Sequence, residues 1–188
     1  MAVTKLEKTI IDVARFLKKE KVPYMIIGGI ANLFWGEPRT TLDVDVTVKV
    51  KDENISAFVA KVNKKFSILE SEPQKFIEKT RVLPIKTRDL TVDIIFAALP
   101  YEEEAIGRAV VRKVANAKVS ICAVEDLIIH KIISERPRDI EDVKKILTRQ
   151  KRAINRKYLT PKIRELSESL NRPEIRKLYL EKMRIKSL

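Results

Sequence analysis

Apolar and polar residues alternate strictly between Leu42 and Val50, and this pattern constrains the fold more than any other part of the chain. Leucine and valines occupy positions 42, 44, 46, 48 and 50, while Asp43 and Asp45 lie between them. A period of two predicts a β-strand with one face in the core. The two carboxylates leave the other face about 7 Å apart, where they can converge on a hard cation such as Mg²⁺. Alone, the pair is also typical of an exposed strand face.

A short apolar run, Tyr24–Ile27, ends at Gly28 and Gly29. We predict a buried strand that enters a tight turn, followed by a short helix over Ile30–Trp35. Glycines between a strand and a helix let backbone N–H groups approach a phosphate closely, and the helix N-terminus adds partial positive charge. The pair matches neither the Walker A nor the Rossmann fingerprint, so by itself it predicts only a turn.

A third carboxylate, Asp93, lies within the apolar run Leu90–Phe96. A buried aspartate without a partner is energetically costly, and a metal shared with Asp43 and Asp45 would satisfy it. The alternative is a strand whose outward face is polar. Three carboxylates beside a glycine turn suit two metal ions that hold a triphosphate and activate an incoming hydroxyl for in-line attack.

One lysine falls in an apolar environment. The predicted helix Val124–Ser134 places Lys131 in the middle of its apolar arc. Such a lysine either extends its amine to solvent or meets an anion, for which a triphosphate is suitable. In the next helix, Asp139 and Asp142 have the spacing of an N-cap and the third helical position, where carboxylates stabilise a helix. We favour capping for Asp142 and leave Asp139 open.

The order of elements predicts an α+β fold, a mixed sheet of about five strands with helices around it. Residues 1–148 form the predicted catalytic domain, and residues 149–188 form a basic helical extension. The two helices of the extension are expected to begin near Thr160-Pro161 and Arg172-Pro173, because proline suits a helix start. The other predicted elements are helices at 4–20, 54–65, 101–109, 124–134 and 139–149, strands at 81–86, 90–97, 110–114 and 118–122, and shorter segments at 67–69 and 73–79. Thr4 and Glu7 have the spacing of a capping box at the start of the first helix.

The formal net charge of +13 is concentrated near the end of the chain. Between Thr148 and Leu188 there are thirteen Lys or Arg against four Glu, a net charge of +9. Such a field attracts nucleic acid, because bound phosphates release counterions. A charged surface of the kind found in thermophiles is the alternative explanation.

Cysteine and histidine usage excludes several classes of protein. Cys122 is the only cysteine, so there is no internal disulfide, and its apolar surroundings predict a buried, inert thiol. With His130 as the only histidine, zinc sites and catalytic triads have little support. Because no apolar run approaches the length of a membrane span, we expect a cytoplasmic protein without a membrane partner.

The motifs together resemble the nucleotidyltransferase superfamily, which has a polymerase-β-like fold, and particularly its AbiEii-like toxins and related uncharacterised bacterial and archaeal members. The resemblance covers about residues 22 to 148 and rests on Ile27-Gly-Gly-Ile-Ala31, Gly36-x-x-Arg39-x-Thr41-x-Asp43-Val-Asp45, Val92-Asp93-Ile-Ile, Val124-Glu-Asp-Leu127-Ile-x-x-Lys131 and Arg136-Pro-Arg-Asp139-x-x-Asp142-Val. Many members of the superfamily have Gly-Ser where this chain has Gly-Gly, and that serine contacts phosphate.

This resemblance implies a role for each matching residue. It assigns Asp43, Asp45 and Asp93 to two Mg²⁺ ions, with Mn²⁺ as an alternative metal. It places Gly28, Gly29, Arg39 and Thr41 at the nucleotide, and it makes Lys131 and Asp139 complete that site, with Lys131 among the catalytic groups.

The resemblance also implies a reaction, the transfer of a nucleoside monophosphate from an NTP such as ATP to a hydroxyl acceptor. We expect the acceptor to be RNA, most simply the 3′ end of a tRNA, with the basic C-terminal helices holding it. One alternative is an AMP-transferring antitoxin that modifies a protein. A second is a non-catalytic module that binds nucleic acid or a partner. A third is one half of a toxin–antitoxin pair whose cognate protein covers the site.

Overall fold

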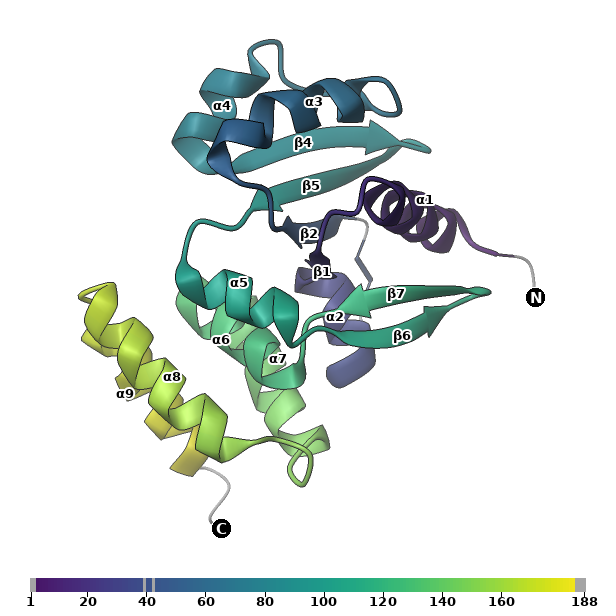
Figure 1. Cartoon of the computed structure of the whole chain (residues 1–188). Helices are drawn as coiled ribbons and strands as arrows, with labels where there is room; N and C mark the ends of the chain where they lie inside the picture. The colour runs from purple at the N-terminus through teal and green to yellow at the C-terminus, as the bar shows by residue number, and fades with distance from the viewer. Residues whose placement is uncertain (1–2, 39, 42, 185–188) are drawn as a thin grey trace. The chain divides into compact units, whose positions relative to one another are not determined.

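The computed structural model describes residues 3–38, 40–41 and 43–184 (Figure 1). The helices are α1 Lys5–Lys19, α2 Gly28–Trp35, α3 Ile55–Asn63, α4 Pro73–Thr80, α5 Pro100–Gly107, α6 Val124–Ser134, α7 Pro137–Arg149, α8 Arg156–Ser169 and α9 Pro173–Arg184, with a 3-10 turn η1 at Asp52–Asn54. The strands are β1 Tyr24–Ile26, β2 Val44–Val48, β3 Ser67–Ile68, β4 Val82–Thr87, β5 Leu90–Phe96, β6 Val110–Val114 and β7 Ala117–Ile121.

Two compact units make up the chain. Unit 1 comprises the chain up to Ile30 together with Thr40–Cys122, and it contains the sheet. Unit 2 comprises the second part of α2 and the chain from Ala123 onward, and it is helical. The predicted boundary at residue 148 separates a catalytic domain from an extension by function, whereas these two units are defined by their compactness. The predicted boundary therefore stays a prediction.

Helix α1 begins where the sequence predicts it. Thr4 Oγ1 accepts a hydrogen bond from the backbone N–H of Glu7 at 3.1 Å, and Glu7 Oε2 accepts one from the N–H of Thr4 at 2.8 Å. This reciprocal capping box satisfies two N–H groups that a helix start leaves without partners. On the buried face of α1, the Phe16 ring packs edge-on against Phe66, with the ring centroids 5.3 Å apart. The centroid of the Phe16 ring lies 6.1 Å from the centroid of the Phe58 ring in α3. These contacts hold α1 beside α3.

The seven strands in the described part of the chain form one mixed sheet in the order β3-β4-β5-β2-β1-β7-β6. Strand β2 pairs parallel with β5, and β1 pairs parallel with β7, whereas the other neighbours are antiparallel. The predicted α+β class is confirmed. The sheet is wider than the predicted five or so strands, because β3 extends one edge and the β6–β7 hairpin joins β1 at the other.

One face of the sheet is apolar and covered by helices. Val44, Val46 and Val48 of β2 are fully buried, and so are the alternate residues of β5 that end at Phe96. Phe58 of α3 packs edge-on against Phe96 with the ring centroids 5.9 Å apart, and α3 and α4 lie over β4 and β5 (Figure 1). The hydrophobic core of unit 1 therefore lies between this face and its helices.

The opposite face carries Asp45 and Asp93, both half-buried. Thr47 lies on this face as well, and it is fully buried. Helix α5 packs against β1 and β2, and Glu103 of α5 pairs with Lys49, the next outward residue after Thr47. The half-buried carboxylates therefore lie nearer one end of a strand face that α5 covers further along.

Unit 2 is built around α6, which contacts α7, α8 and α9. Helix α8 begins at Arg156, so the predicted start near Thr160-Pro161 is wrong. The side chain of Asn155 accepts a hydrogen bond from the N–H of Tyr158 at 3.2 Å and caps the helix there. Proline at position 161 costs one intrahelical bond. Leu159 and Ile163 are fully buried on either side of it, and this packing carries the helix through the proline.

None of the helices in the described ranges combines the length and the apolar composition that a membrane crossing needs.

Candidate active site

The turn between β1 and α2 holds Gly28 in the left-handed conformation, with φ at 62°. A Cβ atom added to Gly28 would lie 1.9 Å from Asp45 Oδ2, and one added to Gly29 would lie 2.5 Å from Thr41 Oγ1. The N–H of Ile27 donates to the carbonyl oxygen of Asp45 at 2.9 Å, which fixes the turn against β2. The structure thus brings together four of the predicted site residues, and the glycines leave the room that the Asp45 and Thr41 side chains occupy.

Replacement of Gly28 with alanine tests this close packing. We expect Gly28→Ala to lower the free energy of unfolding by about 1–2 kcal/mol from the backbone conformation alone, and further because the new methyl group displaces the Asp45 carboxylate. The matched control is Gly107→Ala at the end of α5, where an added Cβ would meet no atom within 4 Å. Thermal unfolding of both variants should show a loss for the first only. Equal stability of the two variants would contradict the packing argument.

Two of the predicted metal ligands come from neighbouring strands. Asp45 and Asp93 are partners in the parallel register of β2 and β5, so their side chains leave the same face. Adjacent strands lie about 4.8 Å apart. Asp43 precedes β2 by one residue, and its carbonyl oxygen accepts a hydrogen bond from Thr41 Oγ1 at 3.4 Å. Burial, together with the negative charge of Asp43, raises the pKa of Asp93. Asp43 and Asp93 are therefore close enough to repel each other.

A cation would relieve this repulsion, and carboxylate oxygens are the ligands that Mg²⁺ prefers. Among the residues with described positions, no three His, Cys, Asp or Glu side chains are already arranged as a group that could hold a metal ion. The donor chemistry of Asp43, Asp45 and Asp93 fits a magnesium ion, while their assignment as its ligands stays a prediction.

Unit 2 contains a buried ion-pair cluster. Lys131 is 3% exposed, and its Nζ lies 2.6 Å from Asp139 Oδ1 and 2.7 Å from Asp142 Oδ2. The lysine therefore meets an anion, as one of the two predicted alternatives has it, and the anion is supplied by the protein itself. Asn32 Nδ2 lies 3.5 Å from the other carboxylate oxygen of Asp142.

The predicted capping role of Asp142 is wrong, and Asp139, for which no role was chosen, lies in the first turn of the helix. Helix α7 begins at Pro137 after Arg136, which makes no side-chain cap, and Asp139 occupies the third helical position. Asp142 lies one turn further in and is 4% exposed. A buried lysine needs a counter-charge more than a helix end needs a cap, because water can serve the helix end but cannot reach the lysine.

The pKa of Asp139 reflects these contacts. Burial opposes its charged form, but hydrogen bonds from Lys131 and from Ser134 Oγ, the latter at 2.7 Å, outweigh burial and leave the pKa below its ordinary value. A carboxyl whose pKa is lowered by folding stabilises the folded state above its unfolded pKa and loses this contribution as the pH falls through the folded value.

We therefore expect the stability difference between the wild type and Asp139→Asn to depend on pH. The wild type should be the more stable protein at neutral pH, and its advantage should shrink as the pH is lowered below about 4, the ordinary pKa of aspartate. Urea unfolding of both proteins across this range measures the difference. An advantage that grows on acidification would contradict the assignment.

Two buried acidic residues in α6 have no counterpart among the predicted site residues. Glu125 is 5% exposed and accepts a hydrogen bond from the N–H of Asn155 at 2.7 Å. Asp126 is fully buried and accepts one from the Tyr158 hydroxyl at 2.9 Å. Both lie in the first turn of α6, where acidic residues are common because they interact favourably with the helix dipole. The sequence therefore carries no signal that they bind the start of α8. They fix the start of α8 to α6.

The remaining predicted residues divide as follows. Gly28, Gly29, Thr41, Asp43, Asp45 and Asp93 belong to unit 1, and Lys131 and Asp139 belong to unit 2. Arg39, which the resemblance places at the nucleotide, lies outside the described residues. The predicted contacts of all these residues with a nucleotide stay predictions.

The mixed sheet and its paired carboxylates beside a glycine turn correspond to a nucleotidyltransferase fold, and solved structures agree. The antibiotic-resistance factor ANT(2″)-Ia in solution is 17% identical over 88% of this chain and 94% of its own, with a TM-score of 0.56. Its crystal structure in complex with adenylyl-2″-tobramycin is 19% identical over 77% of this chain and 89% of its own, with a TM-score of 0.54. The lincomycin-bound lincosamide antibiotic adenylyltransferase LnuA is 16% identical over 78% of this chain and 98% of its own, with a TM-score of 0.51. At these identities the likeness establishes the fold.

The chain belongs to the family DUF6036, described as nucleotidyltransferase of unknown function, whose model matches residues 4–181. A search of curated protein sequences finds no match. The predicted nucleotidyltransferase superfamily is therefore confirmed, and the protein is a transferase of this class. The finer resemblance to AbiEii-like toxins stays a prediction.

Proposed function

We propose that this protein transfers a nucleoside monophosphate from an NTP to a hydroxyl group of RNA, with the 3′ end of a tRNA as the acceptor. The observation that carries the proposal is the register of Asp45 with Asp93, with Asp45 held against Gly28. This arrangement puts carboxylates beside the start of a helix, so that a metal-bound triphosphate and backbone N–H groups can meet.

The roles of the residues follow from their positions. Asp43, Asp45 and Asp93 would hold Mg²⁺, which when bound neutralises the triphosphate and favours ionisation of the attacking hydroxyl. The N–H groups at the start of α2 and the Thr41 hydroxyl would bind the phosphates. The acceptor oxygen then forms a bond to the α-phosphorus while the bond to pyrophosphate breaks, and the acceptor proton leaves to a carboxylate or to water.

The choice of RNA rests on charge. The chain has a formal net charge of +13, and residues 148–188 contribute +9 of it. A polyanionic acceptor gains counterion release from such a surface, and a small neutral acceptor gains nothing from it.

A second acceptor class, a hydroxyl of an antibiotic, is favoured by one observation. Two of the proteins that share the fold were solved with an adenylylated antibiotic or with lincomycin bound. This chain could perform the same chemistry with the same carboxylates, since only the acceptor differs.

Labelled NTPs test the proposal directly. Each NTP is incubated in turn with the protein, Mg²⁺ and total tRNA, and the products are separated into RNA, protein and small molecules. We expect the label on RNA. Label on protein would favour the AMP-transferring alternative and a toxin–antitoxin partnership, and label on added tobramycin or lincomycin would favour the antibiotic acceptor. RNA that binds the protein without acquiring label from any NTP would favour the non-catalytic alternative.

A further inference from the structure

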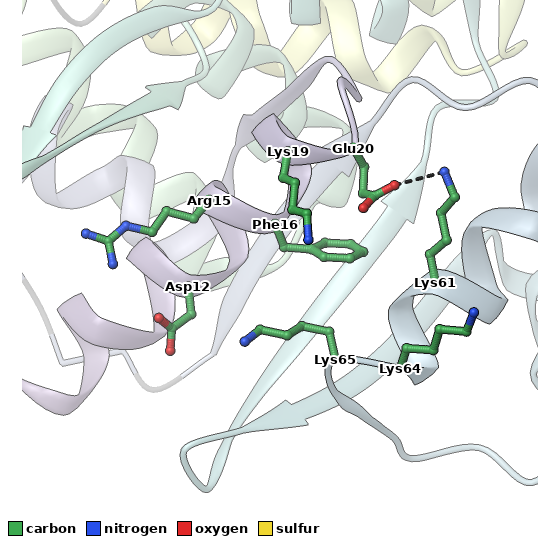
Figure 2. A pocket seen from close by; sticks show the side chains of 8 residues that line it. All are labelled: Asp12, Arg15, Phe16, Lys19, Glu20, Lys61, Lys64 and Lys65. Atoms are coloured by element: carbon green, nitrogen blue, oxygen red, sulfur yellow. Dashed lines mark ion pairs between the residues drawn. The ribbon is translucent and has the colours of Figure 1, made fainter.

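Unit 1 contains a groove of about 600 Å³ between α1 and the end of α3 (Figure 2). Five basic residues line it, namely Arg15, Lys19, Lys61, Lys64 and Lys65, and all five are exposed. In Figure 2, Lys19 and Lys65 extend into the space between the helices, and Arg15 and Lys64 lie toward its two ends. The groove is thus a strongly basic hollow in unit 1, which also holds Asp43, Asp45 and Asp93, and it is separate from the basic helices of unit 2.

The two carboxylates that line the groove do not neutralise it. Glu20 pairs with Lys61 at 2.8 Å, and that hydrogen bond lowers the pKa of Glu20. Asp12 pairs with Arg88, which is outside the lining, at 2.7 Å. Within the described residues, no carboxylate forms an ion pair with Arg15, Lys64 or Lys65. These three cations remain available to a ligand.

The groove lies on the other face of the sheet from the carboxylates of the candidate active site. Phe16 lines the groove and packs on Phe58, which packs on Phe96 of β5. Side chains three residues apart in a strand leave opposite faces, so Asp93 points away from the side that Phe96 occupies. A ligand in the groove is therefore a second ligand, or a second part of a long one.

The lining favours a nucleic-acid backbone over other anions. A selective site for a small phosphate uses fixed, partly buried donors, whereas these cations are exposed and flexible. Phe16 is 8% exposed and occupied by its aromatic neighbours, so it offers no surface on which a base could stack. Mobile cations spread along a hollow attract successive phosphates of a chain and read no base.

A structural explanation covers only part of the pattern. Lysines at the C-terminal end of a helix are stabilised by its dipole, and this accounts for Lys19 in α1 and for Lys61 and Lys64 in α3. Arg15 lies one turn earlier, where the effect has faded, and Lys65 lies beyond the last residue of α3. Their position is explained by a ligand that spans both helices.

We propose that the α1–α3 groove binds the phosphate backbone of RNA without base selection. The choice of RNA as the polyanion rests on the proposed function. The basic character of the groove is observed independently of that function. The groove holds a part of the RNA away from its reacting end, so that binding here is independent of the NTP and of magnesium.

Fluorescence anisotropy with a labelled single-stranded oligoribonucleotide, without NTP or divalent cation, tests this proposal. The variant is Arg15→Gln/Lys64→Gln/Lys65→Gln in the full chain. The matched control is Lys79→Gln/Lys86→Gln/Lys113→Gln, which removes the same charge from exposed positions of unit 1 outside the groove. We expect the groove variant to lose at least about tenfold in affinity at low salt, and its slope of log K against log salt to fall by about 2, since each single-strand phosphate contact contributes about 0.7. The control should keep its slope.

Several outcomes would overturn the proposal. Equal losses in the two variants mean that only net charge matters. Unchanged RNA binding with a lowered melting temperature means that the cations serve the helix ends. Loss of binding to phosphatidylserine vesicles with RNA binding intact identifies a lipid surface instead. If the triple variant does not fold, Lys65→Gln alone should lower the slope by about 0.7. The protein can bind RNA in the groove without transferring a nucleotide, and it can transfer a nucleotide without binding RNA in the groove. Failure of the proposed function and failure of the groove proposal are therefore distinguishable.

Discussion

Replacement of Asp45 with asparagine is expected to reduce nucleotidyl transfer by about two to three orders of magnitude, because each 1.4 kcal/mol of lost transition-state stabilisation costs about tenfold in rate. Asp45 is the carboxylate that lies beside both Asp93 and the Gly28 turn. Asparagine keeps its shape but removes the negative charge that a Mg²⁺–triphosphate complex needs. Label transfer from NTP to RNA at saturating Mg²⁺ measures the effect. The RNA affinity of the variant should not fall, since the cations of the groove are untouched.

The matched control for Asp45 is Asp89→Asn. Asp89 is an exposed carboxylate in the turn between β4 and β5, where it pairs with Lys5 at 3.0 Å. Its positive φ of 59° is tolerated by asparagine. This variant should keep full activity. Comparable transfer by the Asp45 and Asp89 variants would remove Asp45 from the active site.

Asp93→Asn separates function from stability at the same site. Burial and Asp43 disfavour the charged form of Asp93, so a neutral side chain removes an unfavourable interaction. The variant should lose activity as Asp45→Asn does, while its melting temperature without divalent cations should be no lower than that of the wild type. A site that evolution holds against stability is typical of function. A large loss of stability would instead indicate a structural role for Asp93.

Local patterns in the sequence predict most of the fold. The alternation around Val44 predicts β2, and the Thr4–Glu7 spacing predicts the start of α1, because each reports a local period or a local hydrogen bond. The start of α8 was predicted incorrectly, since buried Leu159 and Ile163 outweigh the preference of Pro161. Tertiary packing decides such cases, and it is not written in a single stretch of sequence.

The candidate site shows the same division. That Asp45 and Asp93 are each on a strand can be predicted, but their pairing depends on β2 lying next to β5, a choice among many strand orders. The glycines by themselves predict a turn, and the resemblance places them at the nucleotide, whereas the close approach of Asp45 to Gly28 appears only in three dimensions. The partners of Lys131 come from the following helix, and helix periodicity alone identifies that a partner is needed without identifying it.

The second large effect is expected at Lys131. Substitution of Lys131 by methionine leaves the buried Asp142 carboxylate and the half-buried Asp139 carboxylate without their cation. The removal of one partner of a buried ion pair costs about 3–5 kcal/mol. For a chain of this size we expect the melting temperature to fall by about 6–20 °C, at about 2–4 °C per kcal/mol. Calorimetry or circular dichroism measures the change. The control is Lys144→Met on the same helix as Asp142, where the lysine side chain is 47% exposed and pairs with Glu141 at 3.4 Å. An exposed pair contributes at most about 1 kcal/mol.

A second substitution identifies the cause of that loss. If the cost comes from the uncompensated carboxylates, then Asp142→Asn in the Lys131→Met background should recover part of the stability, although Asp142→Asn alone should be destabilising. The coupling free energy of this double-mutant cycle should exceed about 1 kcal/mol. Residues in direct contact typically give coupling free energies of about 0.5–3 kcal/mol. Additive losses would mean that Lys131 and Asp142 are not coupled, so the uncompensated carboxylate of Asp142 would not be the cause of the loss. A Lys131→Met variant about as stable as Lys144→Met would mean that the ion-pair cluster contributes little to stability.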